Sequence, residues 1–246
     1  MHVHLKGGHS VAPQSRSVGK PSKAQHKFVT TTPDREQLLQ HIRQSKGADT
    51  QRLWRPQLEP PPALAALSLV LVGPKKPPNV GSAARLCNCF ECEDLRVVDS
   101  GCNIRARSSM NAAMGGQRLL WQAAEYSALP DAIADCAYSI AFGRWAEGSM
   151  ASGQRLFRSA SAMAGYLEQE GLLSGSSPSE DTAQQRVAFV FGREVEGLMP
   201  EEVAACNAVC QLPMGRLQES LSLTHAIAIA MSVAFETATD NVCSGE

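Results

Sequence analysis

Apolar residues in this chain gather into short continuous runs, separated by segments in which apolar residues recur at helical spacing. A continuous run of roughly four to eight apolar residues, bounded by turn residues, is typical of a strand buried in a parallel sheet. On this pattern we expect strands at Leu67–Val72, Leu95–Asp99, Tyr138–Phe142, Val187–Phe191 and Val209–Leu212. Helices are expected at Val80–Phe90, Ile104–Met114, Pro130–Cys136, Leu156–Gln169, Pro200–Cys206 and Leu221–Thr237. The alternation predicts an α/β fold, a parallel sheet with helices on both faces.

Composition divides the chain into a basic extension (1–62), a main domain (63–240) and a short tail (241–246). Residues 1–59 hold ten Lys or Arg and four Asp or Glu, whereas the remainder of the chain holds thirteen Lys or Arg and twenty Asp or Glu. We expect the extension to be largely disordered, with one short helix that begins near Thr32 and ends near Gly47. A basic extension indicates a polyanionic partner, a targeting signal or a solvated tail. The Ser- and Gly-rich stretch 171–185 is predicted to be a mobile insertion.

The first 33 residues contain no Asp or Glu, and they carry five Lys or Arg. This composition resembles an organelle transit peptide, so we expect a plastid or mitochondrial location, and otherwise the cytoplasm. No apolar run approaches the roughly 18 residues of a membrane span, so no membrane association is expected. Without a secretory signal, the eight cysteines are expected to be reduced. Cys87, Cys89 and Cys92 lack a second ligand pair, so we interpret them as helix residues and expect no metal ion.

Three short segments carry the candidate chemistry, and each follows an apolar run. They are Asn79-Val80-Gly81-Ser82-Ala83-Ala84-Arg85, Phe191-Gly192-Arg193-Glu194-Val195-Glu196-Gly197-Leu198, and Leu212-Pro213-Met214 with Ser220-Leu221-Ser222-Leu223. Ligands of open α/β sheets bind beyond the carboxyl ends of the strands, where all three segments are expected. The sequence therefore predicts one ligand site built from three loops.

The residue types in these loops suit an anionic or nucleotide-like ligand. Glycine lets a ligand approach the backbone closely, and serine caps a helix whose first N–H groups remain available. Arg85 lies near the start of a predicted helix, where the dipole disfavours a cation unless it faces an anion. Arg85 is thus a candidate phosphate ligand, or else a surface residue paired with Glu91 or Asp94.

The three segments together resemble the SPOUT superfamily of RNA methyltransferases, specifically its TrmH-like 2′-O-ribose group. This group carries N-[IV]-G-x-x-x-R, F-G-x-E-x-x-G-L and an apolar-Pro turn followed by S-L-N. The resemblance runs from about Leu67 to Glu236. It implies a C-terminal trefoil knot, an exception among protein folds, and a homodimer that binds tRNA or rRNA at a composite site. One position departs from the pattern, because Ser222 stands where the family has asparagine.

The resemblance also implies the cofactor and its contacts. The family binds S-adenosylmethionine mainly through backbone groups of the knot. Carried over residue by residue, the cofactor-binding positions are Ala141, Phe142, Gly143, Gly192, Leu212, Met214, Ser220, Leu221 and Ser222. The catalytic positions are Arg85, Asn79 and Glu194.

The expected reaction is methyl transfer from S-adenosylmethionine to a ribose 2′-hydroxyl of tRNA or rRNA. An arginine remains protonated at neutral pH, so we expect Arg85 to hold a phosphate and stabilise the developing alkoxide. The proton is expected to leave through Glu194 or water. The main alternative is a catalytically weak or silent SPOUT RNA-binding protein, motivated by Ser222. A Rossmann-type enzyme is disfavoured because no G-x-G-x-x-G motif follows a strand, and base methylation is disfavoured by the Asn79–Arg85 motif.

Overall fold

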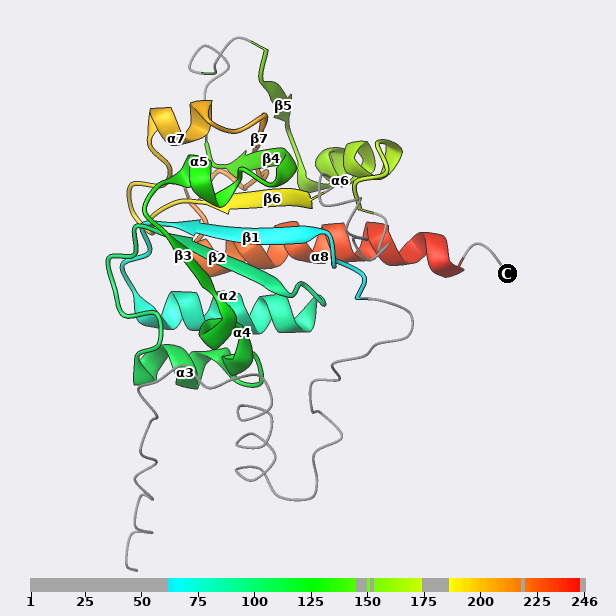
Figure 1. The fold of residues 1–246 in the computed structure, drawn as a ribbon. Coiled ribbons are helices and arrows are strands. Elements are labelled where there is room, and N and C mark those ends of the chain that lie inside the picture. Colours follow the sequence, from blue (N-terminus) through cyan, green and yellow to red (C-terminus); the bar gives the residue numbers. More distant parts are fainter. Residues whose placement is uncertain (1–61, 145–149, 151–152, 174–185, 218–219, 244–246) are drawn as a thin grey trace, which may run out of the picture. The chain divides into compact units, whose positions relative to one another are not determined.

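The computed structural model describes residues 62–144, 150, 153–173, 186–217 and 220–243. Within these residues the chain forms one seven-stranded sheet, with the strand order β3-β2-β1-β6-β4-β7-β5 (Figure 1). The strands are β1 (Leu67–Val72), β2 (Asp94–Val98), β3 (Ala124–Tyr126), β4 (Cys136–Phe142), β5 (Arg155–Phe157), β6 (Arg186–Phe191) and β7 (Ala208–Cys210). Every neighbouring pair runs parallel, so the predicted parallel sheet is confirmed.

Helices cover both faces of the sheet, as predicted (Figure 1). They are α2 (Pro77–Cys89), α3 (Arg107–Ala113), α4 (Gln117–Gln122), α5 (Leu129–Ala132), α6 (Ala160–Gln169), α7 (Pro200–Ala204) and α8 (Leu223–Cys243). One apolar core joins the sheet to α2, α3, α4, α6 and α8, and a smaller core joins it to α5 and α7. Alternate side chains of a strand enter opposite cores: Leu69 of β1 lies in the larger core and Val70 in the smaller one.

The five predicted strands are present with bounds within two residues of those expected. Strand β2 ends at Val98 because Asp99 adopts a left-handed backbone, with φ of 44°. The predicted helix Pro130–Cys136 is wrong in its second half, since α5 ends at Ala132 and Cys136 begins β4.

The predicted helix Leu156–Gln169 is wrong in its first residues, because Leu156 belongs to strand β5. Helix α6 begins only at Ala160, after Ser159, whose hydroxyl oxygen accepts a hydrogen bond from the backbone N–H of Ala162 at 3.1 Å. The sequence pattern also missed β3 and α4. Both β3 and β5 are three-residue strands at the two edges of the sheet, and such short segments carry no readable period.

Other expectations fall partly outside the described residues. The predicted helix between Thr32 and Gly47 and most of the insertion 171–185 lie there. Helix α8 continues to Cys243, three residues into the predicted tail. None of the described helices combines the length and apolar character needed to cross a membrane. The trefoil knot stays a prediction.

Candidate functional site

Loops after the strands β4, β6 and β7 meet at the carboxyl edge of the sheet and line a cavity of about 330 Å³. Most of the predicted cofactor-binding residues line it, namely Phe142, Gly143, Gly192, Leu212, Met214, Ser220 and Leu221. The start of α8 closes one side through Leu223 and Ala226. The volume falls within the range of small-molecule sites. Two of the three sequence segments line the cavity, and the first, Asn79–Arg85, does not contribute to its lining.

Two of the predicted cofactor-binding residues do not line this cavity. Ala141 is fully buried in the smaller core, because strand alternation turns it away from the face that Phe142 occupies. Ser222 is exposed and caps α8: its hydroxyl oxygen accepts a hydrogen bond from the backbone N–H of His225 at 3.3 Å. The serine that replaces the family asparagine therefore contributes helix capping, as its residue type predicts.

Gly192 shapes the cavity wall by allowing the loop behind it to fold back. The backbone groups of Arg193 and Gly197 bond each other in both directions, at 3.0 and 3.1 Å. A Cβ atom on Gly192 would lie 2.1 Å from the carbonyl carbon of Gly197 and 2.2 Å from the nitrogen of Leu198. Only glycine fits here, because both obstructing atoms belong to the backbone.

Arg193 fixes the base of this tight loop. Its guanidinium donates two hydrogen bonds, each 3.0 Å, to the carboxylate of Glu202. These bonds raise the pKa of Arg193 further above its ordinary value, against a smaller opposing effect of burial. The same guanidinium lies over Gly73, where a Cβ atom would approach its Nε to 2.7 Å. Arg193 thus joins the loop after β1 to the loop after β6, and it also lines the cavity.

Glu194 makes the second connection between these loops. Its Oε2 accepts the backbone N–H of Lys75 at 3.0 Å, and its Oε1 accepts both the backbone N–H of Lys76 and the Asn79 side-chain amide at 2.9 Å. Burial by itself would raise the pKa of Glu194, but these hydrogen bonds outweigh burial and lower the pKa below its usual value. The carboxylate is therefore ionised, and both of its oxygens are engaged.

Asn79 and Arg85 both belong to α2 but face different surroundings. The helix begins at Pro77, with Lys76 as the N-cap residue, so Asn79 lies inside the first turn and does not cap it. Arg85 follows Asn79 by six residues, which corresponds to about 240° around the helix. Arg85 does not line the cavity. It is exposed, and its side chain has no partner among the residues that the structure describes. Neither the pairing with Glu91 nor that with Asp94 forms.

Sequence reasoning missed several lining residues, including Val195, Glu196, Leu198 and Ala226. The first three belong to the predicted F-G-x-E-x-x-G-L segment, which already marked this stretch of chain. Ala226 lies three residues after Leu223, on the same face of α8, and that helical spacing was the available signal.

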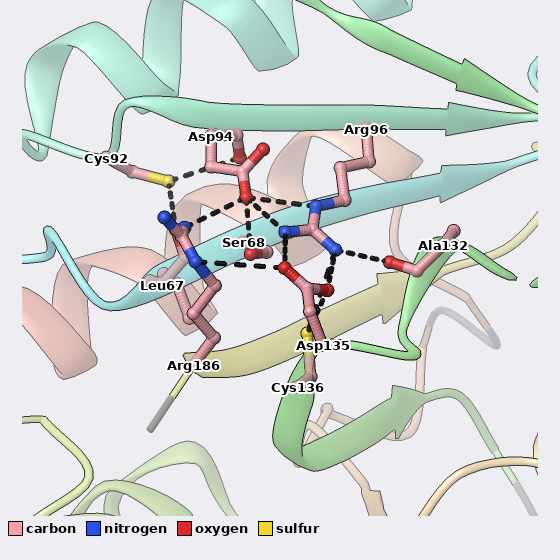
Figure 2. Close-up of polar contacts among 9 residues, drawn as sticks. All are labelled: Leu67, Ser68, Cys92, Asp94, Arg96, Ala132, Asp135, Cys136 and Arg186. Carbon is pink, nitrogen blue, oxygen red and sulfur yellow. Dashed lines mark hydrogen bonds and ion pairs between the residues drawn. The ribbon is translucent and has the colours of Figure 1, made fainter. Parts of the chain in front are cut away.

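A second polar cluster lies at the opposite edge of the sheet, near the amino ends of the strands (Figure 2). The buried Arg96 donates to Asp94 at 2.7 Å, to Asp135 at 2.8 Å and to the carbonyl oxygen of Ala132 at 2.6 Å. Arg186 adds a bond of 3.1 Å to Asp94. The bonds from Arg96 lower the pKa of Asp135. This cluster joins neighbouring strands and takes no part in the cavity.

Within the described part of the chain, the cysteines do not form a metal centre. Cys87 and Cys92 are buried and Cys89 is exposed, and all three are free thiols. Among the described residues, no group of three His, Cys, Asp or Glu side chains is arranged to hold a metal ion.

A comparison with known protein families shows to which family this domain belongs. The family model described as the SpoU rRNA Methylase family matches residues 66–232. This chain belongs to that family. The match spans β1 through about the first half of α8 and includes all three sequence segments. The family assignment rests on the domain that builds the site.

Named relatives of this SpoU-family chain are RNA methyltransferases. It is 30% identical over 166 residues to the tRNA (cytidine-2'-O-)-methyltransferase TrmJ of Methanocaldococcus jannaschii, covering 67% of this chain and 65% of that protein. It is 26% identical over 163 residues to the uncharacterized tRNA/rRNA methyltransferase LasT of Escherichia coli K12, covering 66% of this chain and 65% of that protein. The chain thus spans slightly less than two thirds of the length of these relatives.

Solved structures share the fold of this SpoU-family domain. A probable methyltransferase from Bordetella pertussis superposes with a TM-score of 0.61 at 23% identity, covering 72% of this chain and 98% of that one. TrmJ from Z. mobilis superposes with a TM-score of 0.58 at 24% identity, covering 69% of this chain and 68% of that one. These likenesses show that the domain shares the fold of these two structures.

Proposed function

We propose that this protein is an S-adenosylmethionine-dependent RNA methyltransferase that methylates a ribose 2′-hydroxyl of tRNA or rRNA. The observation that carries the proposal is the glycine-walled cavity, which Glu194 connects to the helix that bears Arg85. Family membership supports the reaction class. The archaeal relative named as a tRNA cytidine 2′-O-methyltransferase makes tRNA the first substrate to test.

The cavity residues suit S-adenosylmethionine in size and chemistry. Gly143 and Gly192 leave backbone accessible, and Phe142, Leu212 and Met214 add apolar wall. The bound cofactor would supply a sulfonium methyl group. The chain's own task is to hold the acceptor hydroxyl in line with that group, and positioning of this kind lowers a reaction barrier strongly.

Arg85 is the residue that we propose to hold the acceptor. A guanidinium carries five N–H donors in a planar fork and has no acceptor. It can therefore hold a phosphate next to the target ribose and stabilise the developing alkoxide, but it cannot accept the proton. Since both oxygens of Glu194 already accept hydrogen bonds, we assign the proton to water and give Glu194 a positioning role.

We propose that the protein acts as a homodimer with a composite site, since Arg85 is exposed and does not line its own chain's cavity. The trefoil knot at the carboxyl edge of the sheet belongs to the same proposal. We also propose import into a plastid or mitochondrion, because residues 1–33 lack acidic residues. Sedimentation of the purified chain tests the dimer, and residues 1–62 fused to a fluorescent protein test the import.

The direct test incubates the full chain with radiolabelled S-adenosylmethionine and unmodified tRNA transcripts, then identifies the product as a nucleoside. A 2′-O-methyl nucleoside is expected, and a transcript with a 2′-deoxy sugar at that position should accept no label. A base-methylated nucleoside would refute the proposal.

The Arg85→Lys variant tests the role of the guanidinium. We expect a severe loss of methyl transfer with unchanged cofactor affinity, because lysine cannot reproduce bidentate phosphate binding. Near-normal turnover would contradict the phosphate-holding role. RNA binding by the wild type without methyl transfer would instead favour the silent RNA-binding alternative, although Ser222 itself lies outside the cavity lining.

A further inference from the structure

The cations near the candidate site divide into those that are paired within the protein and those that are not. Lys75 forms an ion pair with Glu196, Nζ to Oε1 at 2.6 Å. Arg105 forms an ion pair with Glu125. The charges of Lys75 and Arg105 are thus compensated inside the protein. In the sequence, each of them lies within two residues of a cation that is not paired.

Lys76 and Arg107 differ from these neighbours in having no compensation. Both are exposed, and within the part of the chain that the structure describes neither side chain forms a hydrogen bond or ion pair. The backbone N–H of Lys76 is bound by Glu194, so the residue's position is fixed while its ammonium group stays in solvent. Arg85 on α2 is the third cation of this kind, with Lys76 at the N-cap of the same helix and Arg107 on α3.

The packing of α2 against α3 places these cations on adjacent helices (Figure 1). The helices touch at Gly81, where a Cβ atom would lie 2.1 Å from the carbonyl oxygen of Ser109. Arg107 is two residues before that contact on α3. Lys76, the N-cap residue of α2, lies five residues before the contact, and Arg85 on α2 lies four residues after it. Lys76 and Arg85 are therefore separated by about 14 Å along the helix axis, with Arg107 across from the middle.

We propose that Lys76 and Arg107 bind phosphate groups of the substrate RNA beside the one held by Arg85, and that Lys75 and Arg105 do not. This inference rests on the proposed function. The physical reason is that a cation already paired with a carboxylate adds little net attraction for a phosphate. An unpaired cation that binds a phosphate displaces condensed counterions, which makes RNA affinity fall with salt.

The test measures RNA affinity against salt concentration for four single variants with identical charge changes. Lys76→Ala and Arg107→Ala are the test variants, and Lys75→Ala and Arg105→Ala are the matched controls. The probe is a fluorescently labelled tRNA transcript that the wild type methylates, and anisotropy gives the affinity. Binding of S-adenosylmethionine is measured in parallel to show that each variant keeps its cavity.

We expect the slope of log K against log salt to decrease by about 0.7 to 0.9 for each test variant, one phosphate contact being lost. The double test variant should show about twice that change, and the controls should keep the wild-type slope. Equal slopes in the test and control variants would overturn this inference. The proposed function would still stand in that case if the wild type methylates the RNA. A wild type that neither binds nor methylates RNA would overturn both.

Discussion

Replacing Glu194 with glutamine removes the negative charge that connects the loop after β6 to the start of α2. In the native protein, Oε1 accepts the backbone N–H of Lys76 and the Asn79 amide, while Oε2 accepts the backbone N–H of Lys75. Glutamine can keep its carbonyl oxygen toward Lys76 and Asn79. Its amide group must then face the N–H of Lys75, so that two donors oppose each other.

The magnitude follows from these contacts. A hydrogen bond to a charged group contributes about 1.5–3 kcal/mol, and a donor left without an acceptor carries a further cost. One such bond is lost at Glu194 and two are weakened by the loss of charge. Because the site is half-buried and partly screened by solvent, we expect Glu194→Gln to lower the free energy of unfolding by about 2 kcal/mol at pH 7.

The pH dependence gives a second, independent readout. The native pKa of Glu194 is lowered, so its contribution is fully present above the unfolded pKa of about 4.3. It is lost as pH falls through the lowered native value. The difference in unfolding free energy between wild type and variant should therefore stay constant from pH 7 to about 5 and shrink in acid.

Urea unfolding followed by circular dichroism measures both effects. Glu236→Gln is the matched control, because this exposed carboxylate on α8 has no side-chain partner among the described residues. Adding Asn79→Asp to Glu194→Gln exchanges the two bonded partners, so that one acceptor again faces one donor. This double variant should recover part of the lost unfolding free energy. A change below about 0.5 kcal/mol in the single variant, which is usual for surface substitutions, would refute the reasoning.

Three further predictions concern the cavity wall, the cap of α8 and the polar cluster. Gly192→Ala should cost about 3 kcal/mol through overpacking and abolish cofactor binding, whereas Gly165→Ala, whose Cβ meets open space in α6, should stabilise by about 0.5–1 kcal/mol in thermal melts. Ser222→Ala should cost about 1 kcal/mol in urea unfolding, and Ser222→Asn should keep the cap and cost little. Arg96→Met should cost about 3 kcal/mol at pH 7, the low end for a broken pair, because Asp135 is half-exposed. Since Arg96 lowers the pKa of Asp135, the gap from wild type should narrow as pH falls below about 3.9; a constant gap would contradict this origin.

The strands show how far apolar pattern alone carries a prediction. Strand β1 is buried along its entire length, and a strand that is buried on both faces of a sheet carries apolar side chains at nearly every position. The exception is Ser68, whose hydroxyl donates a hydrogen bond to Asp94 at 2.7 Å. Strands β3 and β5 were missed because three residues contain no pattern. They are strands only because neighbouring chain segments, β2 and β7, offer hydrogen bonds to them.

The cavity residues show a similar division. The motifs after β6 and β7 correctly indicated loops that line the cavity. Gly192 was expected to let a ligand approach the backbone, but the backbone of Gly197 and Leu198 occupies the place of its missing side chain. Ala141 and Phe142 were both assigned to the cofactor, yet adjacent residues of a strand point to opposite faces. Only the placement of α8 over one face decides that Phe142 lines the cavity and Ala141 does not.

By itself, the sequence determined the alternation of strands and helices, the family motifs and the positions where glycine is required, because these depend on local periodicity and backbone sterics. The tertiary structure decided which charges are used internally. Glu194 binds the backbone of Lys75 across 119 residues of sequence, and Lys75 pairs with Glu196 across 121. Nothing in the local sequence distinguishes Lys75 from Lys76. They differ because the fold places the carboxylate of Glu196 within bonding distance of Lys75 alone.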